Sequence, residues 1–322
     1  MLVDALRRLL GEAERDRILL GIGDDAAVWQ PSRSHRSVIT TDSLVENVHF
    51  RRETMSLQDA GWRIMAANLS DIAAMGARPV LCTVAVGVPN EHAADELLEL
   101  YRGIDQAAKT YSCPVAGGDL SKASELFVSV TMIGEVRPSN LKTRAGARPG
   151  DVVAVTGMLG ASRAGFDVLE NRGALSENAM QEATRAHRRP RPRLAEGRWL
   201  GASRQVHAMM DVSDGLGTDL QRMCAGSRCG ATLDGIPVAP AVVAMASALN
   251  QDPQTYALGG GEDFELLVAV YPRAFKHLSK RFRARFGGEL YRIGLFEAGS
   301  AVRRRAQDGT MTLLAPGWDH FA

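Results

Sequence analysis

Segments with a strand-like pattern alternate along the chain with segments that have a helical pattern. Short apolar runs, or apolar residues alternating with polar ones, predict strands at 37–42, 80–88, 127–136, 151–156 and 266–270. Apolar residues that recur every three or four positions predict amphipathic helices over 1–20, 56–76, 91–111 and 272–286. Strands interleaved with helices in this way predict an α/β (α+β) protein.

Turn-forming residues between 137 and 150 interrupt both patterns. Arg137-Pro138-Ser139-Asn140 is followed by Gly146-Ala147-Arg148-Pro149-Gly150, and proline and glycine mark turns and loops. A chain of 322 residues is long enough for two domains of ordinary size. We therefore expect an N-terminal domain over 1–137 and a C-terminal domain over 138–322.

Composition narrows the class of protein. The 38 basic and 37 acidic residues leave a formal charge of +1, which does not indicate a partner such as nucleic acid or an anionic membrane. The longest apolar run, 80–88, is too short to span a bilayer. The four cysteines include no Cys-x-x-Cys pair, so we expect buried free thiols rather than disulfides or zinc. These features predict a cytoplasmic enzyme.

Aspartates recur at glycine-rich turns after short apolar segments. The pattern occurs at 21–28 (GIGDDAAV), 114–119 (PVAGGD), 209–216 (MMDVSDGL) and 259–265 (GGGEDFE). Glycine lets the backbone turn tightly and approach a ligand closely. Carboxylates can bind phosphate only through a cation, and Mg²⁺ is commonly shared between carboxylates and substrate phosphates. The repetition favours a site for divalent cations and phosphate.

Two other interpretations of the first turn stay open at this point. Gly21 to Ala26 also spells Gly-x-Gly-x-x-Ala, the loose form of a dinucleotide-binding turn. A dinucleotide-binding turn offers bare backbone N–H groups at a helix N-terminus, whereas here both variable positions are Asp and a proline follows instead of a helix. A plain Asp-rich turn is the structural alternative. At 211–214, helix capping would explain one aspartate but not both.

Other polar residues stand at positions where a ligand could be held. A predicted strand ends on Thr40, Thr41 and Asp42, and Asn68 and Asp71 lie one turn apart on a predicted helix. His49 follows in a half-apolar segment, where a structural role is common. The basic run 187–193 contains two prolines and no aromatic residues, so we interpret it as a solvated connector rather than a nucleic-acid patch.

Taken together, these motifs resemble one family. GIGDDAAV, TTDSLVENVHF, NLSDIAAMGA, GGD, TRAGARPGD, DVSDGL and GGGEDFEL stand in the order and context of the thiamine-monophosphate kinases, members of the aminoimidazole-ribonucleotide-synthetase-like superfamily. The resemblance runs from about Gly21 to the final Trp-Asp-His-Phe. It implies ATP-dependent phosphorylation of thiamine monophosphate to thiamine diphosphate. It also implies two α/β domains and a homodimer in which the N-terminal sheets form a barrel across the dimer, with ATP bound near that interface.

The resemblance further implies roles for individual residues. Several Mg²⁺ ions would be held by Asp25, Thr40, Thr41, Asp42, Asp71, Asp119, Asp211 and Asp214. Of these, the residues assigned to catalysis are Asp42, Asp71, Asp119 and Asp211. ATP would contact Tyr101, Gly118, Asp119, Arg144 and Ser213, and thiamine monophosphate would contact His49, Glu262 and Trp318. Leu120 stands where threonine is typical, which leaves one hydroxyl contact in doubt.

The chemistry of phosphoryl transfer agrees with this assignment. The reaction needs positioning and cancellation of charge more than covalent chemistry, and aspartates holding Mg²⁺ can supply both without a P-loop lysine. The acceptor phosphate is ionised at pH 7, so direct in-line attack needs no strong general base. A selenophosphate synthetase or a hydrogenase-maturation relative would show a cysteine near one end, which this chain lacks. A non-catalytic nucleotide-binding protein on the same scaffold stays open.

Overall fold

The computed structural model describes residues 2–11, 17–22, 26–89, 94–306 and 308–314. The chain forms two compact units. Unit 1 contains Met1–Ile72 and Ala77–Pro138, and unit 2 contains Ala73–Gly76 and Ser139–Ala322. Two predicted site residues, Asp25 and Trp318, lie outside the described residues.

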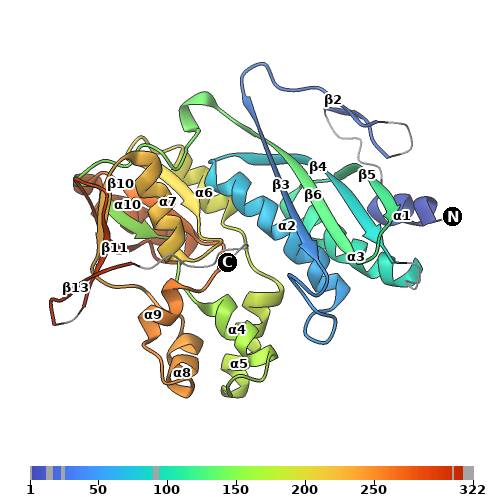
Figure 1. Ribbon diagram of the computed structural model, residues 1–322. Coiled ribbons are helices and arrows are strands. Elements are labelled where there is room, and N and C mark those ends of the chain that lie inside the picture. The colour runs from blue at the N-terminus through green and yellow to red at the C-terminus, as the bar shows by residue number, and fades with distance from the viewer. Residues whose placement is uncertain (1, 12–16, 23–25, 90–93, 307, 315–322) are drawn as a thin grey trace. The chain divides into compact units, whose positions relative to one another are not determined.

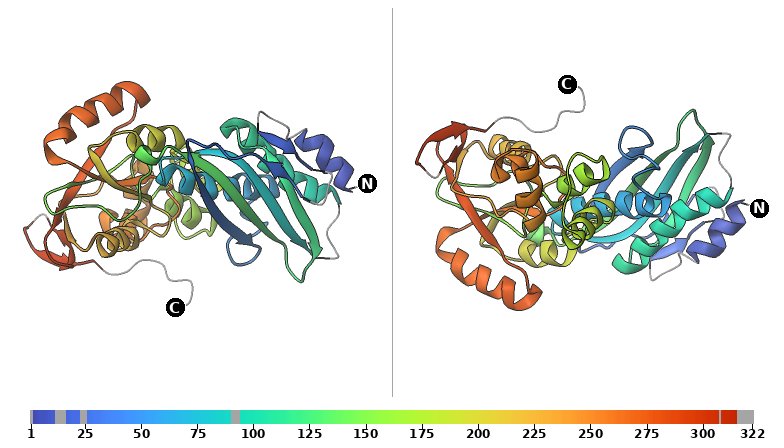
Figure 2. Two further views of the ribbon diagram at one scale, coloured as in Figure 1. Left: turned by 90° about the horizontal axis from the view of Figure 1, so that it is seen from above. Right: turned by 90° about the horizontal axis from the view of Figure 1, so that it is seen from below.

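Unit 1 is built on a mixed four-stranded sheet with helices against one face (Figures 1 and 2). Its strands follow the order β3-β6-β4-β5, with bounds β3 (Arg36–Val45), β6 (Phe127–Val136), β4 (Arg78–Val88) and β5 (Val115–Lys122). β4 and β5 run parallel, and the other neighbours run antiparallel. The helices on the covered face are α2 (Leu57–Ala74) and α3 (Ala94–Tyr111).

Smaller elements complete unit 1. Helix α1 (Leu2–Leu10) packs against α3, and β1 (Ile18–Leu20) pairs with β2 (Val28–Trp29) in a two-stranded sheet. The helix predicted over 1–20 is therefore wrong beyond Leu10. Gly11, at φ +70°, has the left-handed conformation that ends helices, and residues 18–20 belong to a strand.

Side-chain alternation explains why one face of the unit 1 sheet is covered. On β6, Val128, Val130 and Met132 are buried, whereas Ser129 and Thr131 between them are half-buried. The buried residues face the helix layer, in which α2 contributes Ile64, Met65, Leu69 and Ile72, all completely buried. The opposite face carries hydroxyls and the 68% exposed Ile39. None of the three sheets among the described residues closes into a barrel.

Unit 2 contains a seven-stranded sheet in the order β13-β12-β9-β11-β7-β10-β8. The strands are β7 (Val152–Val155), β8 (Val206–Asp211), β9 (Gly230–Leu233), β10 (Leu266–Val270), β11 (Tyr291–Glu297), β12 (Val302–Arg305) and β13 (Met311–Leu313). All neighbours are antiparallel except β9 and β12. Between the strands lie η1 (Pro138–Asn140), α4 (Ala161–Leu169), α5 (Glu177–Arg188), α6 (Leu194–Gly201), α7 (Leu216–Ser227), α8 (Pro240–Ala248), α9 (Pro253–Leu258) and α10 (Pro272–Phe286).

The unit 2 sheet is buried on both faces. On β7, Val153 and Val155 join a core with residues of α7, α8 and α9, whereas Val152 and Ala154 join a second core with residues of α6 and α10. Strands buried on both faces read as continuous apolar runs, which is why 151–156 and 266–270 could be recognised in the sequence. The predicted α/β architecture with mixed sheets is confirmed.

Two further expectations concern the thiols and membrane segments. Cys82, Cys113, Cys224 and Cys229 are all buried and free, as expected. Within the part of the chain that the structure describes, no helix is both long and apolar enough to cross a membrane.

Candidate functional site

Three of the predicted metal ligands of unit 1 lie on the helix-covered face of its sheet. Thr40 on β3 donates its hydroxyl hydrogen to Asp71 Oδ2 on α2, so these two side chains are in contact. Asp42 follows Thr40 by two positions on the same strand, and strand alternation places it on the same face. The structure thus brings Thr40, Asp42 and Asp71 to one side of the sheet.

Two other predicted ligands lie on the opposite, uncovered face. Thr41 Oγ1 donates to the backbone oxygen of Val130 at 3.1 Å and is within 3.2 Å of the Thr131 hydroxyl. Asp119 on β5 pairs with Ala85 in the register of the sheet, and its Oδ2 accepts a hydrogen bond from Ser121 at 2.5 Å. Within unit 1, the predicted ligand set is therefore divided between two faces.

Tyr101 and Gly118 belong to the same region of unit 1. Tyr101 projects from α3 into the core, where burial, with smaller contributions from Cys82 and Asp119, raises the pKa of its phenol. Gly118 pairs with Val84, and a Cβ at this position would stand 2.0 Å from the Val84 backbone oxygen. Gly118 is thus required for close pairing of β5 with β4, whatever ligand it contacts.

His49 lies in the tight loop that follows β3. Its ring Nδ1 accepts a hydrogen bond from the backbone N–H of Val45 at 3.0 Å. The backbone N–H of His49 donates to the Val45 backbone oxygen at 2.8 Å. Because Nδ1 is an acceptor, the neutral ring carries its proton on Nε2. The backbone thereby fixes both the tautomer and the orientation of His49.

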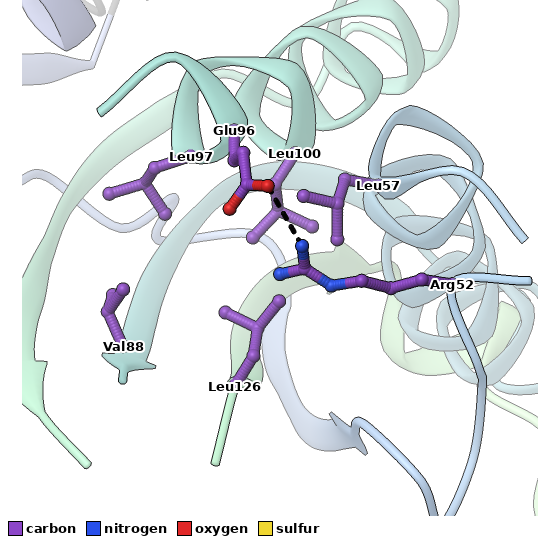
Figure 3. A pocket seen from close by; sticks show the side chains of 7 residues that line it. All are labelled: Arg52, Leu57, Val88, Glu96, Leu97, Leu100 and Leu126. Atoms are coloured by element: carbon purple, nitrogen blue, oxygen red, sulfur yellow. Dashed lines mark hydrogen bonds and ion pairs between the residues drawn. The ribbon is translucent and has the colours of Figure 1, made fainter. Parts of the chain in front are cut away.

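A small pocket of unit 1 lies beside Arg52, which forms an ion pair with Glu96 of α3 (Figure 3). Its volume of about 10 Å³ holds at most one water molecule. An adjoining depression of about 320 Å³ is lined by Arg52, Met55, Ser56, Leu57, Gln58, Glu96 and Glu99. None of the predicted site residues lines either cavity, so neither defines the candidate site.

In unit 2, two loops that are distant in sequence are joined by backbone hydrogen bonds at the end of β8. Glu262 N donates to Ser213 O at 2.7 Å, and Phe264 N donates to Val212 O at 3.0 Å. Asp211, the last residue of β8, is 6% exposed and pairs with Leu266. Ser213 and Glu262, predicted from separate motifs, are therefore brought together.

The backbone of these loops adopts uncommon conformations. Glu262 and Phe264 have φ of 65° and 51°, in the left-handed region that costs a non-glycine residue free energy. Gly215, at φ +96°, begins α7, and a Cβ there would lie 2.9 Å from the Leu258 oxygen. Such strain is held in place by the surrounding hydrogen bonds and is common at functional sites.

Asp219 and Arg222 of α7 support this loop, and the sequence analysis missed both. The completely buried Asp219 accepts hydrogen bonds on Oδ2 from the N–H groups of Ser213 and Asp214, at 3.0 and 3.1 Å. Arg222 donates to Asp219 Oδ1 at 3.1 Å and also binds Asp214. Burial, and to a smaller extent the charge of Asp214, raise the pKa of Asp219 to about 6.

Asp263 connects the 259–265 loop to the start of α4. Its carboxylate accepts hydrogen bonds from Gly160 N at 2.6 Å and Ser162 N at 3.2 Å, two of the N–H groups that a helix leaves without an internal partner. Desolvation raises the pKa of Asp263 to about 7 against the favourable effect of these two bonds. Asp263 therefore acts as a helix cap supplied from a distant loop.

We expect the variant Asp263→Asn to gain stability relative to the natural protein as the pH rises. A pKa raised from 3.8 to about 7 means that the folded state retains a proton that the unfolded chain releases. This stabilising contribution is complete below about pH 4 and is lost as the pH rises towards 7. An asparagine has no proton to lose. Its amide oxygen can still accept from Gly160 N, the closer of the two donors, although its NH2 group replaces the oxygen that accepts from Ser162 N.

Urea unfolding at pH 5 and pH 8 checks this expectation. The free energy of unfolding of Asp263→Asn, minus that of the natural protein, should be larger at pH 8. The control variant Asp308→Asn changes an exposed aspartate of the 306–310 turn, whose pKa is lowered by Thr310, and should leave the pH dependence in this range unchanged. Identical pH profiles for all three proteins would contradict the assignment.

The basic run 187–193 connects α5 to α6, as expected of a connector, but it is partly buried, so the prediction that it is solvated is wrong. His187 is 7% exposed, with Nδ1 3.2 Å from the Ser162 hydroxyl. Arg193 pairs with the buried Glu265, donating from Nε to Oε2 at 2.8 Å, and Thr156 donates to the same carboxylate at 2.7 Å. The partners of these residues are distant in sequence, so a local pattern could not identify them.

Arg144 is the predicted ATP residue that unit 2 places apart from the two joined loops. Its backbone oxygen accepts a hydrogen bond from Ser227 at the C-terminal end of α7, whereas Ser213 lies before the N-terminal end. A helix of this length spans about 16 Å.

Among the described residues, no three Asp, Glu, His or Cys side chains are gathered as a metal centre.

Comparisons with known proteins identify the family. Residues 23–136 match the AIR synthase related protein N-terminal domain, and residues 148–306 match the corresponding C-terminal domain. The thiamine-monophosphate kinase of Synechococcus elongatus is 36% identical over 306 residues, which cover 93% of this chain and 91% of that protein.

Two solved structures are similar along nearly the whole chain. The crystal structure of thiamine-monophosphate kinase from Stenotrophomonas maltophilia has 35% sequence identity and a TM-score of 0.83, and the match covers 96% of both chains. A structure of AaThiL complexed with AMPPCP and TMP has 29% identity and a TM-score of 0.78, covering 99% of this chain and 96% of that one. On these matches, the chain belongs to the thiamine-monophosphate kinase family of AIR synthase related proteins.

Proposed function

We propose that the protein transfers the γ-phosphoryl group of ATP to thiamine monophosphate, giving thiamine diphosphate. The observation that carries this proposal is full-length similarity to curated thiamine-monophosphate kinases, together with a structural relative complexed with AMPPCP and TMP. AMPPCP is a non-hydrolysable form of ATP, so the relative's two ligands correspond to the two substrates. The four free cysteines are those of a reducing compartment, which favours the cytoplasm.

The residues of the candidate site fit Mg²⁺. All the predicted ligands offer carboxylate or hydroxyl oxygen, the donors that this hard cation prefers. Asp42 and Asp71 of unit 1, and Asp211 and Asp214 of unit 2, lie in the described residues and would hold the ions, with Asp25, Thr40, Thr41 and Asp119 as further ligands. Bound Mg²⁺ supplies the positive charge that offsets the phosphates of both substrates.

The protein groups position the two substrates for direct in-line attack by the acceptor phosphate. His49 presents an Nε2–H donor of fixed tautomer to thiamine monophosphate, because its Nδ1 is engaged by Val45. Glu262 is held in the left-handed region, with its N–H bonded to the Ser213 oxygen. This contact supports a role for Glu262 in binding thiamine monophosphate beside a role for Ser213 in binding ATP. The ionised acceptor needs no base, so no side chain has to remove a proton.

We further infer a homodimer in which the unit 1 sheets of two copies pair into a barrel. The uncovered sheet face supports this, because it combines the 68% exposed Ile39 with rows of threonine and serine on β3 and β6. Edge strands and open faces of this kind are commonly covered by another chain. Gly118 and Asp119 lie on β5, at the edge of the sheet opposite β3, and with Tyr101 of α3 they would then contact ATP close to the interface.

Product analysis tests the proposed function. Purified protein, ATP, Mg²⁺ and thiamine monophosphate should yield thiamine diphosphate by chromatography, with no product from thiamine or from an aminoimidazole precursor. With γ-labelled ATP, label should reach the product without being trapped on quenched protein. Magnesium-dependent ATP binding without turnover would show that the scaffold is correct and the acceptor is wrong. Label on the protein would exclude direct transfer.

A further inference from the structure

Arg222 shares its guanidinium between two aspartates that differ in exposure. Asp219 is completely buried, with Oδ2 occupied by two backbone N–H groups and Oδ1 by Arg222. The Asp214 side chain is 23% exposed and also binds Arg222, whose own side chain is 42% exposed. Asp219 is thus fixed on several sides, whereas Asp214 can turn towards solvent.

The two carboxylates need a cation between them. Their mutual repulsion is visible in Asp219, since the charge of Asp214 disfavours its ionised form. Arg222 is the positive group that the structure places on both, with one contact of 3.1 Å to Asp219 and a shorter one to Asp214. A divalent ion that binds Asp214 would compete with this guanidinium, because one carboxylate cannot fully neutralise both cations.

We propose that Arg222 is an exchangeable counter-ion that neutralises Asp214 until a divalent cation binds that carboxylate, and that it then remains on Asp219. The inference rests on the proposed function for the role of Asp214 as a metal ligand. Asp219 is the fixed point of the exchange, because its bonds to Ser213 N and Asp214 N hold the loop while the Asp214 side chain changes partner. Asp219 and Arg222 are therefore positioning residues.

Substitutions at the two positions have opposite expected effects on metal affinity. Arg222→Met keeps the length of the side chain and removes the competing cation, so a divalent ion should bind Asp214 more tightly. In Asp219→Asn the amide oxygen can still accept from the two N–H groups. The substitution removes one negative charge, so that Arg222 is paired with Asp214 alone of the two positions. The divalent ion should therefore bind more weakly to Asp219→Asn.

The test measures the binding of Mn²⁺ to the full chain by electron paramagnetic resonance. Neither ATP nor thiamine monophosphate is present. We expect the Kd for Mn²⁺ to fall about three- to tenfold in Arg222→Met and to rise by a similar factor in Asp219→Asn. The matched control is Arg283→Met, which removes one positive charge from α10, where Arg283 forms a surface ion pair with Glu289. It should leave the Kd unchanged.

Thermal unfolding with and without Mn²⁺ supplies a second readout. Arg222→Met should unfold at a lower temperature without metal and gain more from Mn²⁺ than the natural protein does. If Arg222→Met does not fold, Arg222→Lys serves in its place, because lysine keeps the charge but cannot span both carboxylates. Arg222→Lys should then bind Mn²⁺ more tightly than the natural protein, by a smaller factor than the one expected for Arg222→Met.

Equal or weaker Mn²⁺ binding by the Arg222 variants, or unchanged binding by Asp219→Asn, would overturn the proposal. Because no substrate is present, this outcome is independent of whether the protein phosphorylates thiamine monophosphate. Normal counter-ion exchange in a protein without kinase activity would instead mean that only the proposed function had failed.

Discussion

Asp71→Asn is expected to lower kcat for thiamine diphosphate formation by about a thousandfold. Asp71 is placed against β3 by the Thr40 hydroxyl and shares the covered sheet face with Asp42, so as the proposed metal ligand it would stand on a rigid element. Loss of a carboxylate that holds a catalytic metal removes charge stabilisation worth several kcal/mol in the transition state. Steady-state kinetics at saturating ATP and several Mg²⁺ concentrations measure the effect.

The fold should survive this substitution. An asparagine oxygen can still accept the hydrogen bond from Thr40, so thermal unfolding without metal should match the natural protein. Glu99→Gln is the control, because it neutralises an exposed α3 carboxylate that pairs only peripherally with Arg102. Normal turnover by Asp71→Asn would mean that the side chain serves as a structural partner of Thr40 and not as a metal ligand.

Glu265→Ala is expected to lower the free energy of unfolding by about 3 to 5 kcal/mol. The Glu265 side chain is 6% exposed and accepts hydrogen bonds from Arg193 and Thr156. Its removal therefore takes the hydrogen-bonded carboxylate from a mostly buried guanidinium, which Glu196 contacts less closely, at 3.7 Å. Urea unfolding measures the loss. Although Glu265 ends the GGGEDFE motif, its contacts are those of a structural residue.

An exposed glutamate provides the comparison for this prediction. Glu289→Ala breaks an ion pair with Arg283 at the surface and should cost less than about 1 kcal/mol. The double variant Glu265→Ala, Arg193→Ala should recover part of the loss, because the guanidinium that Glu265 neutralises is then absent as well. If Glu265→Ala is no more destabilising than Glu289→Ala, the buried pair does not hold the 259–265 loop.

Hydrophobic periodicity predicted the elements whose buried side chains follow a regular pattern. The segments 80–88 and 266–270 are strands with apolar sides. The helix predicted from residue 56 is also found, and the Ser56 hydroxyl accepts from Asp59 N at 3.1 Å at its start. The first helix was predicted too long because leucines continue past Gly11, and those at 18–20 belong to a strand. Apolar content alone could not separate the two elements.

The motif residues of the candidate site could be predicted from the sequence, but the residues that hold them in place could not. Ser213 and Glu262 come from recognisable motifs, but their contact depends on pairing between loops that periodicity does not describe. Asp219 resembled an ordinary acid in the first turn of a helix, and only the fold shows that it binds the preceding loop. Strand alternation alone, however, could have separated Thr40 from Thr41, since neighbours on a strand face opposite sides.

The order of strands in the unit 2 sheet has a consequence for synthesis of the chain. β7 lies between β10 and β11, and the bonded pair Thr156 and Leu266 is 110 residues apart. At ordinary translation rates, β7 leaves the ribosome about 5 to 20 s before its first sheet neighbour exists. During that interval the backbone of β7 has no strand to pair with, and its buried positions lack the residues of β10 and α10 that later pack around them. Unit 2 therefore completes its core only late in translation, and nascent chains that stop before residue 266 should depend on chaperones.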